Sequence, residues 1–142
     1  MNLIEINQDL FTVERTPETY FCHCISADAK MGAGIAVPMR VEFGLIELQF
    51  EADRKPFEVG TCVEYNNVLN LITKQNYWEK PTFNSMYDSL LALRHVVKRK
   101  GIKRIVMPTI GAGLDRLNWK DTLDVIKRLF EDIDIEIVVC YY

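Results

Sequence analysis

The sequence predicts an α/β domain with three layers, in which a mixed, largely parallel central sheet lies between two layers of helices. Short apolar runs alternate with longer segments of helical periodicity along the 142 residues. In the second half, strands and helices alternate, which favours right-handed crossovers and parallel pairing. The length suits one domain with a sizeable core, so we expect a single domain over residues 1–142.

The first half of the chain reads as two strands, two helices and two further strands. The predicted strands are Leu3–Ile6, Tyr20–Ile25 and two β-rich runs that end at Asn66 and Thr73. A helix is expected between Gly34 and Gly44, where Pro38 should kink the helix or restrict its start because proline lacks an amide donor. A second short helix is expected from Leu45.

Two helices in the second half show clear apolar stripes. The first stripe comprises Met86, Leu90, Leu93 and Val97, and Gly101 should end that helix. The second stripe comprises Trp119, Leu123, Ile126, Phe130 and Ile133. Asn118 can cap this helix, with Asp121 in the capping-box position. Strands at Arg104–Pro108 and Ile135–Cys140 complete the order β, β, α, α, β, β, α, β, α, β.

The overall charge argues against several classes of partner. The formal net charge is -3 and the pI is about 5.4, so the whole chain has no general attraction to nucleic acid or to an anionic membrane. No apolar run approaches the roughly 20 residues of a membrane helix. The N-terminus lacks the basic and apolar regions of a secretory signal. We therefore expect a cytoplasmic protein, or a nuclear one in a eukaryote.

The cysteines favour free thiols over a metal site. Cys22, Cys24, Cys62 and Cys140 include no C-x-x-C pair, and neither of the two histidines has ligand spacing to them. Buried, reduced thiols are the ordinary state of such residues in a reducing compartment. We expect no metal, and we interpret His23 and His95 as structural.

Two Gly-Ala-Gly segments stand where predicted strands lead into helices. The first, Gly32–Gly34, lies in the loop Ser26–Ala36, and the second, Gly111–Gly113, lies in MPTIGAGLDRLNW, Met107–Trp119. A single G-x-G is equally typical of a tight turn. Two such loops can hold a diphosphate from both sides, because glycines expose backbone N–H groups near helix starts. Ligands in parallel sheets bind beyond the carboxyl ends of the strands, where these loops lie.

Lys74, Asp115 and Asp9 are the candidate chemical groups. A lysine after an apolar strand is usually solvated, but partial desolvation in a crevice favours the neutral, nucleophilic amine of Lys74. Asp115 either complements a helix dipole and pairs with Arg116, or acts as a general acid and base if it shares a cleft with Lys74. Asp9 is either a turn cap or an acceptor for an exocyclic amine.

Four blocks of sequence then occur in a familiar order: HCISADAKMGAGIA, NLITK, KPTF and MPTIGAGLDRLNW, with a strand at the C-terminus. Together they resemble a macrodomain, and more narrowly the terminal ADP-ribose protein glycohydrolase branch, also called O-acyl-ADP-ribose deacylase. The resemblance covers nearly the whole chain. It implies an ADP-ribose-binding α/β/α fold that hydrolyses ADP-ribose from glutamate and aspartate esters of proteins and deacylates O-acyl-ADP-ribose.

The resemblance also implies roles for individual residues. Lys74 would attack C1″ of the distal ribose once the ring opens, and Asp115 would relay protons and resolve the adduct. The implied binding residues are Asp9 and Leu10 at the adenine, Ser26 at the distal ribose, Gly32, Ala33, Gly34 and Ile35 along the diphosphate, Thr109, Ile110, Gly111, Ala112, Gly113 and Leu114 on its other side, and Tyr142 or Tyr141 beside the adenine. Ala112, where the family often has cysteine, and Pro38 depart from the family pattern.

The expected partners are ADP-ribose, O-acyl-ADP-ribose and mono-ADP-ribosylated proteins, bound by a monomer without a cofactor. One alternative is a reader that binds ADP-ribose without cleaving it, although a reader has no need of the lysine and aspartate. Another is an eraser of ADP-ribose on DNA bases. Lys98–Arg104 has five basic residues in seven that could contact phosphates, but cations at a helix C-terminus also complement its dipole. Tyr77 and Trp78 could close over the ribose, meet the modified partner, or pack within the loop.

Overall fold

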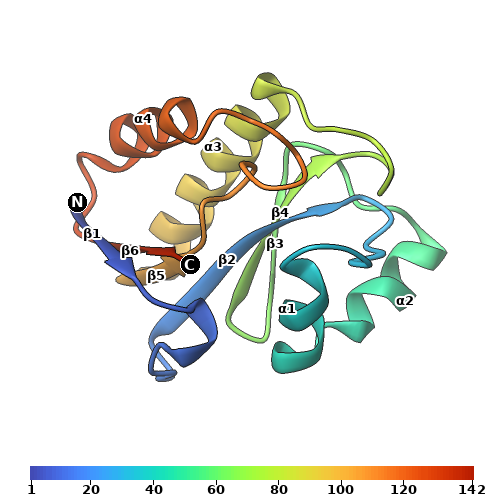
Figure 1. Ribbon diagram of the computed structural model, residues 1–142, viewed down its shortest axis with the longest axis horizontal. Helices are drawn as coiled ribbons and strands as arrows, with labels where there is room; N and C mark the ends of the chain where they lie inside the picture. Colours follow the sequence, from blue (N-terminus) through green and yellow to red (C-terminus); the bar gives the residue numbers. More distant parts are fainter.

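A computed structural model describes residues 1–142 as one mixed sheet flanked by helices (Figure 1). The strands are β1 (Asn2–Asn7), β2 (Thr19–Ser26), β3 (Cys62–Tyr65), β4 (Val68–Lys74), β5 (Arg104–Met107) and β6 (Glu136–Tyr141). The helices are α1 (Ala36–Phe43), α2 (Ile46–Arg54), α3 (Phe83–Lys100) and α4 (Trp119–Phe130), with a short 3-10 helix at Leu10–Thr12. The predicted order of strands and helices is confirmed, and only the 3-10 helix was not anticipated.

The six strands lie in the order β1-β6-β5-β2-β4-β3. Every neighbouring pair is parallel except β3 with β4, which form an antiparallel hairpin. The predicted mixed and largely parallel sheet is therefore confirmed. The chain leaves β2 toward β4 on one side of the sheet and leaves β5 toward β6 on the other. The carboxyl ends of β2 and β5 thus flank a point where the topology reverses, which is where open α/β sheets bind ligands.

The helices cover both faces of the sheet and complete the three layers. Figure 1 shows α3 and α4 on one face and α1 and α2 on the other. Two separate cores result, one of 18 buried residues that includes Leu90 and Phe130, and one of 17 that includes Phe21 and Met39. Because both faces bury comparable cores, the inner strands read as continuous apolar runs rather than alternating ones.

The helix boundaries follow from local chemistry. Pro38 lies in the first turn of α1, where a missing amide donor costs nothing, so it restricts the start of the helix without kinking it. Gly101 ends α3 with a positive φ of 68°, as predicted. Asn118 caps α4 by accepting from the Asp121 amide at 3.2 Å. The structure ends α4 at Phe130, so Ile133 lies beyond the helix although it packs against the same core.

All four cysteines are free thiols, as predicted. No group of three or more His, Cys, Asp or Glu side chains is arranged to hold a metal ion. None of the helices combines the length and the apolarity that a membrane span needs.

Candidate functional site

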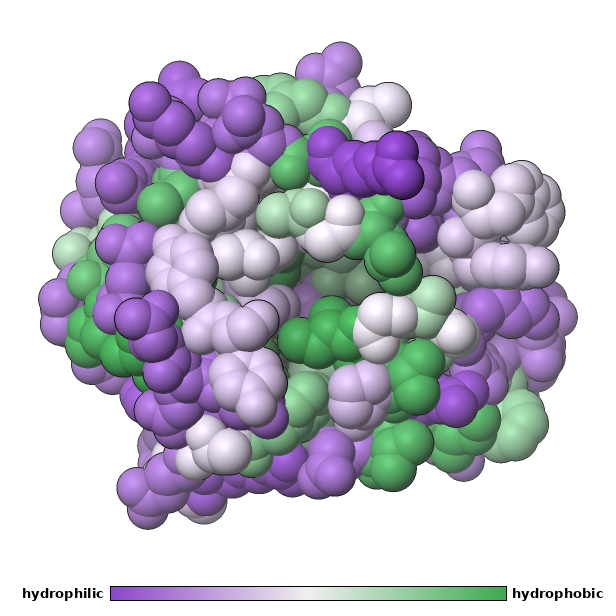
Figure 2. Space-filling view, in the orientation of Figure 1, coloured by the Kyte–Doolittle hydropathy of each residue, from purple (hydrophilic) through white to green (hydrophobic).

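A cavity of about 960 Å³ opens at the carboxyl ends of β2, β4 and β5. The loops that follow these three strands supply most of its lining, and Figure 2 shows a hollow near the centre of this face among apolar and weakly polar residues. Cavities of roughly 300–1,000 Å³ are typical of small-molecule and cofactor sites. The cavity is therefore large enough for a ligand of the size of a dinucleotide.

Lys74 and Asp115 meet at one wall of this cavity. The Lys74 Nζ donates to Asp115 Oδ1 at 2.8 Å, and the two side chains are only 16% and 17% exposed. Asp115 is the sole hydrogen-bond partner of this amine within the protein. Lys74 ends β4, whereas Asp115 lies in the loop after β5. The fold therefore brings together the two residues that the sequence selected as candidate catalytic groups.

A register shift at the end of β4 positions Lys74. Ile25 of β2 is opposite Ile72 of β4, but the next residue, Ser26, is opposite Lys74. Thr73 is thus an extra residue in β4, and such bulges re-aim the neighbouring side chains. Ser85 at the start of α3 fixes this point by donating to the Thr73 carbonyl at 2.6 Å. The lysine is consequently held by both the sheet and α3.

The first glycine loop offers unpaired backbone donors to the cavity. The N–H groups of Gly32, Ala33, Gly34 and Ile35 donate no hydrogen bond within the protein. All four residues line the cavity immediately before α1, where the helix dipole adds positive potential. Gly34 has a positive φ of 61°, and a Cβ at Gly32 would project into open space. This loop is built to approach an anion closely.

The two glycines of the second loop, Gly111 and Gly113, differ in how much space surrounds them. Gly111 has a φ of 76°, so its backbone conformation favours glycine. A Cβ there would also lie 2.7 Å from Met86 Cε, so the end of the Met86 side chain would have to move. A Cβ at Gly113 would meet nothing within 4 Å. The Gly113 carbonyl accepts from the Arg116 amide at 3.1 Å, which closes the turn that presents Asp115. Thr109, Ile110 and Leu114 also line the cavity.

The two glycine loops approach each other across the cavity. A Cβ at Gly34 would be 3.2 Å from Leu114 Cδ1, so the Leu114 side chain rests on the first loop. Among the lining residues, Lys30, Lys74 and Lys80 carry positive charge, whereas Asp115 is the single acidic residue. The cavity is therefore locally positive although the whole chain carries a net charge of -3. This balance favours an anionic ligand.

The floor of the cavity includes His23 and Cys24 of β2. His23 Nε2 lies 2.6 Å from Asn70 Oδ1, while its buried Nδ1 has no partner. Burial lowers the pKa of His23 from 6.5 to about 4, although the hydrogen bond to Asn70 opposes this change. Burial, and secondarily the nearby Asp115 carboxylate, raises the pKa of the Cys24 thiol well above its usual range. Both side chains are therefore neutral.

Some predicted binding residues lie outside this lining. Asp9, Leu10, Ala112 and Tyr142 do not contribute to the cavity wall. Asp9 caps the 3-10 helix by accepting from the Phe11 amide at 3.0 Å, which is the turn-capping role considered above. Leu10 is buried in the core, and Tyr142 is fully exposed. Ser26 does line the cavity, and its hydroxyl donates to the Asp28 carboxylate.

Several lining residues were not predicted as site residues from the sequence. Met31 is buried with a positive φ of 49°, Lys80 donates to the Leu114 carbonyl, and Lys30 stands at the edge near Asp53. Tyr77 and Trp78, considered above without a fixed role, also line the cavity. Lys80 belongs to the KPTF block, and the position of this block shortly after β4 could have marked Lys80 as a site residue. No local pattern marks Met31.

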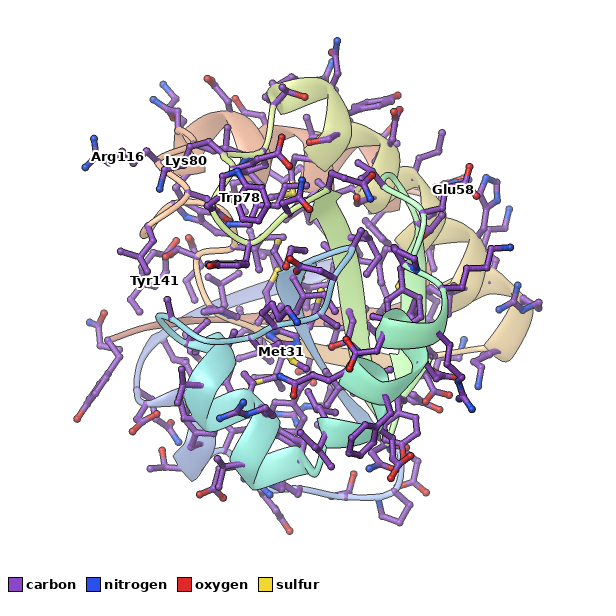
Figure 3. All side chains as sticks on the ribbon, turned by 90° about the vertical axis from the view of Figure 1, so that its right-hand side faces the viewer. Met31, Glu58, Trp78, Lys80, Arg116 and Tyr141 are labelled. Atoms are coloured by element: carbon purple, nitrogen blue, oxygen red, sulfur yellow. The ribbon has the colours of Figure 1, made fainter.

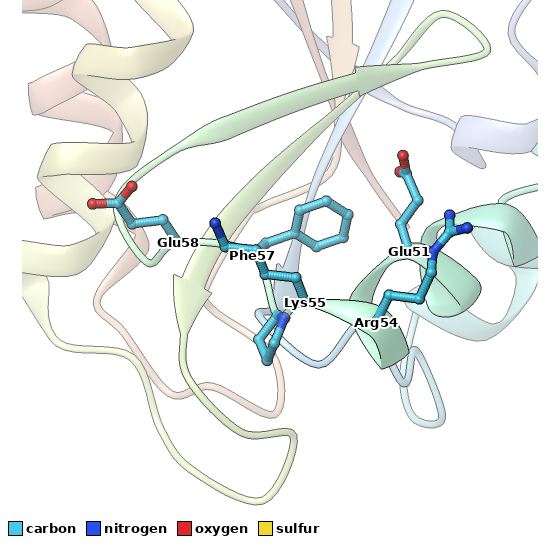
Figure 4. A pocket seen from close by; sticks show the side chains of 6 residues that line it. Glu51, Arg54, Lys55, Phe57 and Glu58 are labelled. Atoms are coloured by element: carbon cyan, nitrogen blue, oxygen red, sulfur yellow. The ribbon is translucent and has the colours of Figure 1, made fainter.

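A second cavity, of about 440 Å³, lies after the end of α2 (Figure 4). Its wall is made of Glu51, Arg54, Lys55, Pro56, Phe57 and Glu58. Figure 4 shows Glu58 directed to one side and Glu51 with Arg54 to the other. The charged groups are balanced and do not converge, so this cavity suggests no chemistry.

Comparison with known proteins agrees with this geometry. The human protein named ADP-ribose glycohydrolase OARD1 is 36% identical over 135 residues, which cover 94% of this chain and 88% of that protein. The macrodomain of Mycobacterium tuberculosis DarG superposes with a TM-score of 0.85 at 18% identity, covering 98% of this chain and 96% of that one. The structure described as Thermosipho africanus DarTG in complex with ADP-ribose gives a TM-score of 0.80 at 19% identity, covering 99% of this chain and 42% of that one.

No protein-family model matches the chain. The structural neighbours establish the fold through their high TM-scores. They establish nothing beyond the fold, because their sequences are less than 25% identical to this one. The predicted macrodomain fold is thereby confirmed. The match to the OARD1 proteins, 36% identical over 135 residues, also establishes the sequence family. The chain has the macrodomain fold and belongs to the family of the ADP-ribose glycohydrolase OARD1 proteins.

Proposed function

We propose that this protein is an ADP-ribosyl hydrolase that uses Lys74 as nucleophile and Asp115 as general acid and base. The observation that carries the proposal is the 2.8 Å contact between these two side chains at the wall of a cavity that both glycine loops line. The OARD1 relatives carry the name ADP-ribose glycohydrolase, and a macrodomain neighbour is described in complex with ADP-ribose. Both names support ADP-ribose as the ligand, and the OARD1 name also supports the class of reaction.

ADP-ribose suits the cavity in charge and shape. The diphosphate would lie between the free N–H groups of Gly32–Ile35 and the loop Thr109–Leu114, within reach of the positive end of α1. The distal ribose would then lie near Ser26 and the Lys74–Asp115 pair. The adenine would extend toward Asp9, Leu10 and Tyr142, which lie outside the cavity lining.

The reaction begins with a proton transfer within the pair. Asp115 takes a proton from the Lys74 ammonium, and the free amine adds to C1″ of the distal ribose as the bond from C1″ to the substrate carboxylate breaks. The electron pair leaves with the carboxylate, which receives the proton from Asp115. Asp115 then takes a proton from water as the hydroxide adds to C1″ and the lysine nitrogen departs. Return of that proton to Lys74 restores the starting pair.

This chemistry favours substrates in which the ribose is joined to a carboxylate. Carboxylates are good leaving groups, so an amine nucleophile suffices. A glutamate or aspartate ester at C1″ of the ribose presents the same bond as an ADP-ribose that carries its acyl group at C1″. We therefore propose mono-ADP-ribosylated proteins and O-acyl-ADP-ribose as the substrates of a monomeric chain.

The proposal is tested by measuring release of free ADP-ribose from a glutamate-linked ADP-ribosylated protein. The wild-type chain should release it, and Lys74→Ala should not, while both should bind free ADP-ribose by calorimetry. Lys103→Ala is a matched control, because Lys103 pairs with Asp134 at 3.6 Å on the exposed surface, away from the cavity. Binding without release by the wild-type chain would instead identify a reader.

A further inference from the structure

Tyr77 and Trp78 form the tip of a closed turn beside the cavity. The Glu79 amide donates to the Asn76 carbonyl at 3.1 Å, and the Asn76 amide donates back to Glu79 Oε1 at 2.7 Å. The two aromatic rings pack edge to face, with centroids 5.2 Å apart and planes at 88°. A turn closed at both ends with its rings in mutual contact has a defined shape before any ligand binds.

Two further contacts attach this turn to the other loops of the cavity. The Tyr77 amide donates to Asp28 Oδ2 at 3.1 Å, which joins it to the loop after β2. The Lys80 ammonium donates to the Leu114 carbonyl, which joins it to the loop after β5. Figure 3 shows Trp78 and Lys80 at the same end of the molecule as Arg116, which follows Asp115. The turn is therefore fixed next to the wall that holds Lys74 and Asp115.

The aromatic side chains remain largely open to solvent despite these attachments. Tyr77 is 57% exposed and Trp78 is 67% exposed, although both line the cavity. Rigid, exposed aromatic groups contribute large contact areas at a small entropic cost when a partner covers them. Their contact with each other leaves more than half of each residue exposed to solvent.

The depth of the reacting pair indicates what covers the rings. Lys74 and Asp115 are 16% and 17% exposed, whereas Tyr77 and Trp78 are more than half exposed. The distal ribose that the pair acts on would therefore lie deeper in the cavity than the exposed parts of the rings. A short acyl group ends within a few bonds of C1″ and stays near the pair. A polypeptide joined through a glutamate side chain must continue outward past the turn. Of these two leaving groups, the polypeptide is the one that extends far enough to cover the exposed rings.

We propose that Tyr77 and Trp78 are specificity-determining residues that contact the polypeptide flanking the ADP-ribosylated side chain. This inference rests on the proposed function, because it assigns these residues to the leaving-group side of the same reaction. Although both residues line the cavity, the proposal assigns their exposed ring surfaces to the leaving group. The chain therefore discriminates a modified polypeptide from a small ester of ADP-ribose.

The test compares two substrates across matched variants. Values of kcat/KM are measured for a glutamate-linked ADP-ribosylated peptide and for O-acetyl-ADP-ribose with wild type, Trp78→Ala, Tyr77→Ala and Trp78→Phe. Phe50→Ala is the control, because Phe50 is 55% exposed on α2 and lies outside the cavity lining. We expect the alanine variants to lose about tenfold on the peptide, as loss of an aromatic contact does, with O-acetyl-ADP-ribose unaffected and Trp78→Phe close to wild type.

Two results would overturn the inference. An equal loss on both substrates would assign the rings to the ribose, and no loss on either would leave them without a role in recognition. Should the wild-type chain cleave neither substrate, the proposed function fails, and the inference is then judged by binding. The Lys74→Ala chain should bind the modified peptide more tightly than free ADP-ribose. Adding Trp78→Ala to that chain should remove the difference in affinity without weakening the binding of free ADP-ribose.

Discussion

Lys74 Nζ and Asp115 Oδ1 lie 2.8 Å apart although 41 positions separate the two residues in the chain. One residue ends β4, and the other lies in the loop after β5, two strands away across β2 in the sheet. Both side chains are mostly buried, so their interaction is less screened than that of a surface pair. An ion pair held at the wall of an otherwise basic cavity is a natural proton-transfer unit.

Replacement of Asp115 tests whether the aspartate is needed for proton transfer. Asp115→Asn removes the base that accepts the lysine proton, so turnover of an ADP-ribosylated protein should fall by about 10²–10⁴-fold while ADP-ribose still binds. Asp134→Asn, at an exposed pair with Lys103, should leave turnover unchanged. Because the two residues act as a unit, Lys74→Ala combined with Asp115→Asn should be no slower than the slower single variant. Additive losses would mean that they act separately.

The two outer positions of the second glycine loop should respond differently to a methyl group. Gly111→Ala forces a residue with a Cβ into φ 76° and against Met86, so it should destabilise the fold by about 1–3 kcal/mol in urea unfolding. Gly113→Ala adds a methyl group in open space and should leave stability within about 0.5 kcal/mol. If the diphosphate approaches this loop, Gly113→Ala should nevertheless weaken ADP-ribose binding. Normal stability of Gly111→Ala would show that the loop is free to rearrange.

Stability should depend on pH through His23. Its pKa in the folded protein is about 4, below the ordinary 6.5, so the unfolded chain binds the proton more readily as the pH falls. The free energy of unfolding is therefore fully maintained above pH 6.5 and should decrease by about 3 kcal/mol as the pH falls toward 4. His23→Gln should remove this decrease. Urea unfolding of the wild-type chain and the variant at a series of pH values measures the effect.

The ion pair of Arg94 and Asp132 acts at lower pH and can be separated from this effect. The hydrogen bond from Arg94 lowers the pKa of Asp132 from 3.8 to about 2, so its contribution disappears only as the pH falls through that lower range. A decrease between pH 6.5 and 4 that persists in His23→Gln would assign the effect to other groups.

Chelation should leave the reaction unchanged. The proposed nucleophile is an amine and the leaving group is a carboxylate, so neither needs a Lewis acid for activation. Turnover after prolonged treatment with EDTA should equal that of the untreated protein. Activity that disappears with EDTA and returns with a divalent ion would require a different mechanism.

The sequence was informative where the chemistry is local. Apolar stripes located α3 and α4, and Gly101 and Asn118 marked helix ends. The end of an apolar strand selected Lys74, and the position just after the second Gly-Ala-Gly selected Asp115. The bulge at Thr73 could not be predicted, because an apolar run does not reveal its register against β2. The contact from the Tyr77 amide to Asp28 was equally hidden, since it joins loops 49 positions apart. Such contacts depend on the tertiary arrangement and leave no periodic signal.

The most direct test of the account is intact mass spectrometry of the chain during turnover of a glutamate-linked ADP-ribosylated protein in the presence of cyanoborohydride. The glycosylamine formed between Lys74 and C1″ exchanges with its ring-opened iminium form, and this reagent reduces the iminium to a stable amine. The account predicts that the wild-type chain gains one ADP-ribosyl group at Lys74 while the substrate loses one, and that Lys74→Ala does neither. Release of ADP-ribose by Lys74→Ala at the wild-type rate, with no adduct on either chain, would contradict it.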